Sequence, residues 1–130
     1  AKPLRVKFGI DPTAPDIHLG HSVPLMKLRQ FQEVGHKAVL IIGDFTAKIG
    51  DPSGRAEARK PLSDPEIRKN FKNYIAQAGK IIDIKKTEIH FNSEWFGKMT
   101  AREFLELTNK ATVQQVTKRR DFKKRIKEEG

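Results

Sequence analysis

Hydrophobic and polar residues alternate at the start of the chain. Every second position is apolar: Leu4, Val6, Phe8 and Ile10. A period of two places one face of a strand on a hydrophobic core, so the pattern predicts a first strand that ends near Ile10. The segment 11–16 contains two prolines, which cannot donate to a strand ladder, and it is therefore expected to be a connecting loop.

Apolar residues with helical spacing follow this loop. Leu25, Leu28 and Phe31 recur three residues apart, with charged residues between them. Gly35 can adopt the left-handed conformation that commonly ends a helix. The pattern therefore predicts a helix over 18–34.

A short apolar run, 38–43, comes after the predicted helix. Its branched side chains are typical of a strand that is covered on both faces within a parallel sheet. Strand, helix and strand form a βαβ unit, whose helix begins at the carboxyl edge of the sheet, where such folds bind ligands. The sequence therefore predicts an α/β fold with a parallel sheet and flanking helices.

The second part of the chain, 61–130, is interpreted as helical and connective. Ser63 and Glu66 form a capping box ahead of an apolar stripe that is expected to run about five turns, up to Ile82. Alternation over 88–91 predicts a third strand. Two further capping pairs and a basic stretch follow: Thr100 with Glu103, Thr112 with Gln115, and 118–130. The two pairs predict short helices. The basic stretch could contact RNA or could simply be a solvated helix, and both alternatives remain open.

Composition narrows the class of protein. A length of 130 residues suits a single domain, and 37% hydrophobic residues suit a globular one. No apolar run reaches the roughly 18 residues that a membrane-spanning helix requires, so no membrane partner is expected. The absence of cysteine excludes disulfides and thiolate metal sites and fits a cytoplasmic protein. The formal net charge of +10 favours phosphate-bearing partners, either nucleotide or nucleic acid.

Two histidines stand at the start of the first predicted helix. His18 and His21 are three residues apart and share one helix face, where free backbone amides favour anions such as phosphate groups. Gly20 leaves room between them for a flat ring to approach the backbone. A pair of surface histidines without function remains open as an alternative. No metal site is assigned, because the spacing and the glutamate of the metalloprotease motif are both absent.

Two motifs give these histidines a context. The stretch 8–21 has the sequence FGIDPTAPDIHLGH, and 49–55, after the second predicted strand, has the sequence IGDPSGR. The first resembles the signature region of class I aminoacyl-tRNA synthetases, and the two together are similar to bacterial tyrosyl-tRNA synthetases. The similarity continues through 92–95 and 121–125, so that it covers nearly the whole chain. The resemblance implies the first half of a Rossmann-like class I fold, with 1–60 as its nucleotide-binding βαβ unit.

The resemblance implies a two-step tyrosine–tRNA ligase. Tyrosine attacks the α-phosphorus of ATP to give tyrosyl adenylate and pyrophosphate, and the tyrosyl group then passes to tRNA. In this pattern His18 and Thr13 contact the terminal phosphate as pyrophosphate departs, and His21 holds the ribose and adenine side. Tyrosine, tRNA and ATP are the implied partners, with Mg²⁺ carried by the nucleotide.

Further site residues follow from the same resemblance. The implied ATP-binding residues are Gly9, Asp11, Gly20 and His21. Asp51 matches the carboxylate that receives the α-ammonium group of tyrosine, although its Gly/Pro surroundings also suit a plain turn. Arg55 and Arg59 form a candidate pyrophosphate loop, beside the alternative of a solvated loop. Lys7 stands where many bacterial members carry a tyrosine, so recognition of the substrate phenol stays unassigned.

The family pattern contains segments that these 130 residues lack. They are the second half of the nucleotide-binding fold, with its Gly-Gly-x-Asp-Gln-type and Lys-Met-Ser-Lys-Ser-type segments, and the anticodon-binding domain. The chain is therefore interpreted as a single N-terminal fragment of the catalytic domain, with low or no activity alone. Its parent is expected to be a homodimer, and the fragment could self-associate through open sheet edges. Two alternatives remain: a non-catalytic basic RNA-binding or scaffold domain, and another adenylyl-transferring enzyme.

Overall fold

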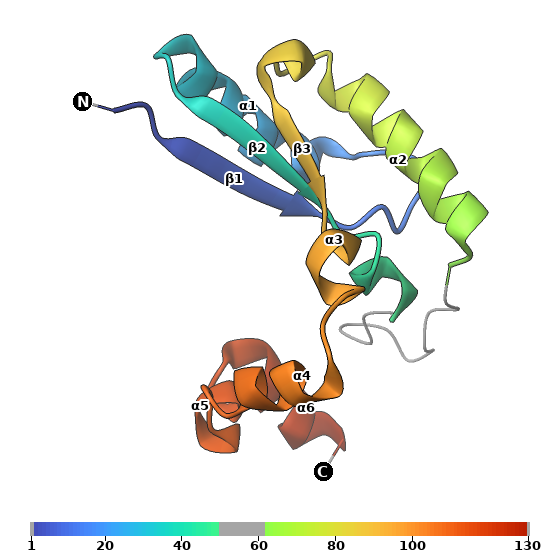
Figure 1. Ribbon diagram of the computed structural model, residues 1–130, viewed down its shortest axis with the longest axis vertical. Coiled ribbons are helices and arrows are strands. Elements are labelled where there is room, and N and C mark those ends of the chain that lie inside the picture. Colours follow the sequence, from blue (N-terminus) through green and yellow to red (C-terminus); the bar gives the residue numbers. More distant parts are fainter. Residues whose placement is uncertain (1, 50–61, 130) are drawn as a thin grey trace.

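The computed structural model describes residues 2–49 and 62–129, and the expected parallel sheet lies within them. Three strands form it: β1 (Arg5–Ile10), β2 (Lys37–Ile42) and β3 (Glu88–Phe91). They lie in the order β1-β2-β3, and both neighbouring pairs are parallel (Figure 1). The α/β class and the three predicted strands are confirmed.

The strands end together at one edge of the sheet. Ile10 pairs with Ile42, and Ile42 pairs in turn with Phe91. The residues that follow each strand are therefore neighbours, although they come from distant parts of the sequence. This carboxyl edge is the place where parallel α/β folds position ligand-binding residues.

Two long helices support the sheet, α1 (Leu19–Glu33) and α2 (Asp64–Ala78). The predicted end of α1 is confirmed, because Gly35 has the positive φ of 83° that follows a helix of this kind. Shorter helical segments complete the described chain: η1 (Thr46–Lys48), η2 (Ile84–Lys86), α3 (Ser93–Phe96), α4 (Ala101–Thr108), α5 (Val113–Thr117) and α6 (Arg120–Glu129).

The hydrophobic core lies between the sheet and the two long helices. Its buried members are Leu25, Leu28, Ala38, Leu40, Ala78 and Ile82. Within the described residues both α1 and α2 cover this same face of the sheet (Figure 1). On the opposite face Lys7 and Gly9 of the edge strand β1 are exposed, whereas Val39 of β2 is buried and Ile41 is half-buried. Strand β2 is therefore largely covered on both faces, as its apolar run predicts, although both long helices lie on one side.

Helix α2 is shorter than its apolar stripe indicates. The capping box is present, with the Ser63 amide donating to Glu66 Oε2 at 2.8 Å. The helix ends at Ala78, after about four turns rather than five, and Gly79 caps it. Ile82 lies beyond this end, and the turn after the helix brings it back into the core, where it is 3% exposed. The apolar period that continues to Ile82 therefore reflects burial in the core and not the length of the helix.

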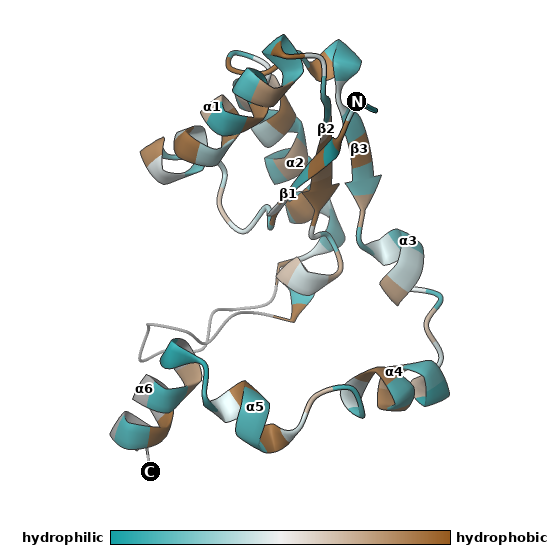
Figure 2. Cartoon of the chain, turned by 90° about the vertical axis from the view of Figure 1, so that its left-hand side faces the viewer, coloured by the Kyte–Doolittle hydropathy of each residue, from teal (hydrophilic) through white to brown (hydrophobic). Residues whose placement is uncertain are grey.

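The helices after α3 extend away from the sheet (Figure 1). The capping boxes predicted for α4 and α5 are both present. Figure 2 shows hydrophobic positions on these helices, and several are exposed: Phe104, Leu105, Leu107 and Val113. This segment of the described chain therefore adds nothing to the buried core. No helix within the described ranges is long and apolar enough to cross a membrane.

Candidate functional site

Polar side chains from three strand ends meet at the carboxyl edge. The Thr46 hydroxyl, in η1 after β2, donates to Asp11 Oδ1 at 2.9 Å. Asn92, which follows β3 and is 6% exposed, donates from Nδ2 to Thr46 Oγ1 at 2.9 Å. Its Oδ1 accepts from the Phe45 amide at 2.8 Å. The predicted ATP-binding residue Asp11 is thus held in place by side chains that follow the other two strands.

Gly43 provides the space in which Asp11 sits. It is buried directly after β2, and a Cβ atom there would overlap the Asp11 carboxylate and approach the Thr46 hydroxyl to 2.5 Å. No role was predicted for Gly43, Thr46 or Asn92. The positions of Gly43 and Asn92 do carry a signal, because Gly43 ends the apolar run 38–43 and Asn92 directly follows the predicted strand 88–91, as Asp11 follows the first strand. Thr46 gives no comparable signal, because it comes four residues after the end of β2.

The two histidines cap the start of α1 with their side chains. His18 is the N-cap residue, and its Nδ1 accepts from the Gly20 amide at 3.1 Å. His21 Nδ1 accepts from the His18 amide at 3.2 Å, which completes a capping box made of two imidazoles. The His21 amide donates to the His18 carbonyl at 2.8 Å. The expectation of free amides at this helix start is therefore wrong for Gly20 and His21, because the chain's own acceptors already bind both.

The capping geometry determines which ring nitrogens carry protons. Both Nδ1 atoms accept hydrogen bonds, so the hydrogen-bond network assigns the proton of each neutral ring to Nε2. The ring centroids are 4.0 Å apart, so the two rings lie side by side. Burial, and then the proximity of His18, lower the pKa of His21 below its usual value, which favours its neutral form. The site therefore offers two neighbouring N–H donors to a ligand without requiring that either ring be charged.

Gly20 is required for this arrangement. A Cβ atom at this position would lie 2.8 Å from His18 Cε1 and 2.9 Å from His18 Nδ1. The sequence predicts that this glycine leaves room for a ligand ring. In the structure the room is occupied by the His18 imidazole, which folds back over the glycine to cap the helix.

Acidification is expected to weaken the fold through His21. Because its pKa is lowered, the folded chain binds fewer protons here than the unfolded chain, and stability falls as the pH drops below the ordinary value of 6.5. The effect should be small, since the His21 side chain is only partly buried. The carboxyl groups with lowered pKa values, such as that of Glu88, titrate at more acidic pH and are separate from this window.

Urea unfolding at about pH 7.5 and about pH 5.5 measures this loss across the histidine range. The matched variant His21→Gln keeps an acceptor for the His18 amide and cannot titrate. It should lose less stability between the two pH values than the unaltered chain. An equal loss in both proteins would show that His21 is not the responsible group.

The other predicted site residues are less constrained. Gly9 lies in β1 on the exposed face of the sheet, and a Cβ atom there would meet nothing closer than the Ile41 carbonyl at 4.0 Å. Thr13 is half-buried in the loop after β1, and its amide donates to the Asp11 carbonyl at 2.8 Å. Three predicted residues lie outside the described part of the chain: Asp51, Arg55 and Arg59. Among the residues described, no group of three or more acidic or histidine side chains could hold a metal ion.

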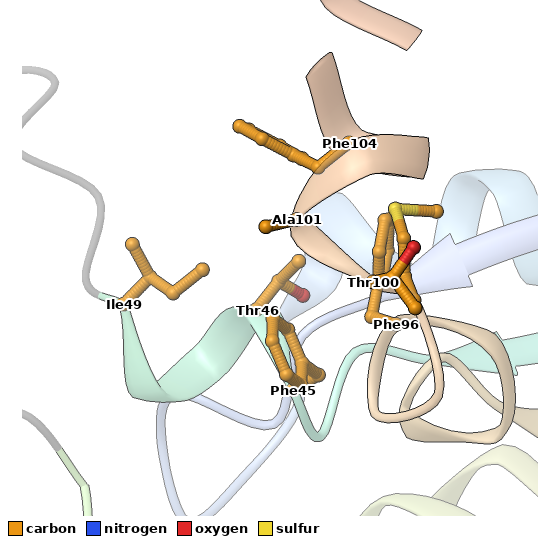
Figure 3. Close-up of a pocket in the computed structure, with 8 residues that line it drawn as sticks. Phe45, Thr46, Ile49, Phe96, Thr100, Ala101 and Phe104 are labelled. Atoms are coloured by element: carbon orange, nitrogen blue, oxygen red, sulfur yellow. The ribbon is translucent and has the colours of Figure 1, made fainter. Parts of the chain in front are cut away.

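An apolar hollow of about 440 Å³ adjoins the carboxyl edge on the side of α3 and α4 (Figure 3). Three phenylalanines line it, Phe45, Phe96 and Phe104, and Thr46 lies on its wall. Of the described residues that line the hollow, none carries a charged side chain, and this lining suits an apolar group and not a triphosphate. Thr46 therefore separates two environments, the polar one around Asp11 and the apolar one in the hollow.

Comparison with known proteins places the chain in one family. The family described as class I tRNA synthetases (W and Y) matches residues 1–130. The tyrosine–tRNA ligase of Carboxydothermus hydrogenoformans is 57% identical over 127 residues, which are 98% of this chain and 31% of that protein. The tyrosine–tRNA ligase of Thermotoga maritima is 56% identical over 125 residues, 96% of this chain and 31% of that protein. The chain thus spans about a third of the length of these relatives.

Solved structures agree on the fold. A C-terminally truncated mitochondrial tyrosyl-tRNA synthetase of Aspergillus nidulans superposes with a TM-score of 0.79 at 23% identity, over 98% of this chain and 40% of that one. The corresponding enzyme of Coccidioides posadasii gives a TM-score of 0.73 at 27% identity, over 97% of this chain and 37% of that one. The arrangement of strands and helices is therefore that of the matched part of these structures.

Proposed function

Because the chain belongs to the class I tRNA synthetases of the W and Y family, we propose that it is the N-terminal part of a tyrosine–tRNA ligase and that the carboxyl edge of its sheet binds ATP. The two relatives named above, each more than half identical to the chain, are tyrosine–tRNA ligases, which supports tyrosine as the amino acid. One observation carries the ATP site. The capping box of α1 occupies both Nδ1 atoms and so leaves Nε2–H as the donor of His18 and of His21, on two rings whose centroids are 4.0 Å apart.

In the proposed reaction a carboxylate oxygen of tyrosine attacks the α-phosphorus of ATP. The bond between that phosphorus and the bridging oxygen breaks, and its electrons leave with pyrophosphate. His18 donates from Nε2 to the terminal phosphate, and the Thr13 hydroxyl donates beside it, so both stabilise charge that grows as pyrophosphate departs. His21 contacts the ribose and adenine side with Gly20, and Gly9 allows the adenylate to approach β1 closely.

The remaining parts of the proposal concern residues and molecules around this centre. Asp11, held by Thr46, would contact the adenylate, and Asp51 would receive the α-ammonium group of tyrosine. Arg55 and Arg59 would contact pyrophosphate. Mg²⁺ would arrive with the nucleotide, and the tyrosyl group would pass from the adenylate to tRNA. We place the parent protein in the cytoplasm as a homodimer, whose further segments complete the catalytic site.

The chain alone is expected to bind ATP and tyrosine, with low or no activity. Isothermal titration with ATP measures binding, and tyrosine-dependent exchange of labelled pyrophosphate into ATP measures the first reaction step. We expect measurable affinity for ATP. Any pyrophosphate exchange that is detected should require tyrosine. Salt-dependent tRNA binding without affinity for ATP or tyrosine would contradict the proposal. It would favour a basic RNA-binding domain, a function that the net charge of +10 also suits.

A further inference from the structure

Three amide side chains of α2 contact the loop that joins β1 to α1. Asn70 Nδ2 donates to the Pro12 carbonyl at 3.0 Å, and Asn73 Nδ2 donates to the Pro15 carbonyl at 3.2 Å. Gln77 uses both ends of its amide. Its Oε1 accepts from the Ile17 amide at 2.9 Å, and its Nε2 donates to the Asp16 carboxylate at 2.5 Å. These three residues are called the α2 amide row below.

The spacing of the row explains how one helix follows the loop. Positions 70, 73 and 77 lie on one helix face, about one turn apart, so each amide reaches a successive part of the loop. Asn70 holds the end next to Asp11, and Gln77 holds the end next to His18. The bonds join residues that are 58 to 61 positions apart in the sequence. No local pattern of the loop could therefore indicate them.

The loop depends on these contacts because it has few of its own. Two of its residues, Pro12 and Pro15, have no backbone N–H, which limits the internal hydrogen bonds it can form. Pro12 is fully buried and Asn70 is 7% exposed, so the bond between them lies away from solvent. A buried amide that loses its partner is costly, which makes this contact strongly favoured.

The same helix face also reaches the histidines. Tyr74, which lies between Asn73 and Gln77 and is 3% exposed, has its ring centroid 6.0 Å from that of His21. Helix α2 therefore touches the signature region at both ends of the loop and at the second histidine. Any displacement of the loop relative to α2 would move His18 with it, because Ile17 directly precedes this N-cap residue.

We propose that the α2 amide row consists of positioning residues for the ATP site. Asn70, Asn73 and Gln77 fix the path of the loop and thereby set the place of Thr13 and of the two imidazoles. They do not contact the nucleotide themselves. The inference rests on the proposed function for the identity of the ligand, whereas the positioning of the imidazoles can be measured without a ligand.

A swap of hydrogen-bonding roles tests the inference at Gln77. Gln77→Glu keeps the acceptor for the Ile17 amide but places a carboxylate against Asp16, so the loop should shift. Adding Asp16→Asn gives the pair a donor again, with the roles reversed and with the net charge of the unaltered chain. Asp16→Asn alone keeps the acceptor for Gln77 Nε2. Ala76→Glu, on an exposed position of α2, adds the same charge outside the row and serves as the control.

Three measurements are made on each chain. NMR spectra of the imidazole nitrogens and hydrogen exchange of the Ile17 amide report the loop directly, and titration with ATP reports the site. Gln77→Glu should shift the resonances of His18 and His21, speed exchange at Ile17, and weaken ATP binding about tenfold, as expected for the loss of a charge-assisted hydrogen bond. The Asp16→Asn/Gln77→Glu pair should restore all three within about threefold, and Ala76→Glu should resemble the unaltered chain.

The two proposals fail in different ways. Unchanged imidazole resonances and unchanged Ile17 exchange in Gln77→Glu would overturn the positioning role, whatever the affinity for ATP. Equal effects of Gln77→Glu and Ala76→Glu would also overturn it, because charge alone would then be responsible. If the unaltered chain does not bind ATP while the resonances shift and are restored by the second substitution, the positioning role is supported and the proposed ATP site is not.

Discussion

A chain with His18→Ser and His21→Gln is expected to keep helix α1 and lose the ATP site. Serine at the N-cap and glutamine three residues later form an ordinary capping box, so the helix start retains its side-chain acceptors. Both Nε2–H donors are removed, and with them the groups proposed to stabilise the departing pyrophosphate. Removal of one comparable donor in an enzyme lowers the rate about 100- to 1,000-fold, so any tyrosine-dependent exchange should become undetectable. ATP affinity should fall by at least about tenfold.

The matched comparison is His18→Ala with His21→Ala, which removes the donors and the cap together. This chain should lose about 1 kcal/mol or more of stability, as substitutions of N-cap residues by alanine do. Circular dichroism and urea unfolding separate the two variants, while ATP titration should show the same loss in both. Retained ATP binding in the Ser/Gln chain would mean that the imidazoles serve only as caps, which is the structural alternative for this motif.

The sequence predicted the fold well where short-range patterns determine it. Alternation over β1, the branched run of β2 and the capping box at Ser63 each depend on neighbours within a few residues, and each is present. The end of α2 was misplaced because Ile82 continues the apolar period after the helix has stopped at Ala78. A periodic apolar pattern indicates which residues are buried. It does not show whether a residue such as Ile82 is buried by the helix itself or by the turn that follows it.

The site was predictable in its residues and less so in its geometry. Asp11 and His18 could be found because each follows or begins a regular element at the carboxyl edge. The roles of Thr46 and Asn92 depend on hydrogen bonds that span 35 and 46 positions, and no spacing in the sequence indicates such contacts. The missing side chain at Gly20 is visible in the sequence, whereas its role in binding a ligand stays a prediction. The group that needs the space is His18, which only the folded backbone reveals.

Gly43→Ala is expected to disturb the ATP site through Asp11, which lies at the end of the β1–α1 loop away from the histidines. The new methyl group would occupy the place of the Asp11 carboxylate and crowd the Thr46 hydroxyl, so Asp11 must leave its hydrogen bond. Overfilling of a packed site commonly costs about 1–3 kcal/mol, and a loss within that range is expected in urea unfolding. Because Asp11 is proposed to contact the adenylate, ATP affinity should fall by about tenfold or more when the chain is still folded.

A second glycine separates this effect from general destabilisation. Gly35 has a φ of 83°, and no atom lies within 4 Å of the place where its Cβ would be, so Gly35→Ala strains the backbone without crowding a neighbour. It follows α1, at the end opposite the histidines, and its substitution should lower stability while ATP affinity stays within about twofold of the unaltered chain. If the two variants weaken ATP binding equally at equal stability, the position of Asp11 does not matter for the nucleotide. If only Gly43→Ala weakens ATP binding, the space that Gly43 leaves for the Asp11 carboxylate is needed for the binding site.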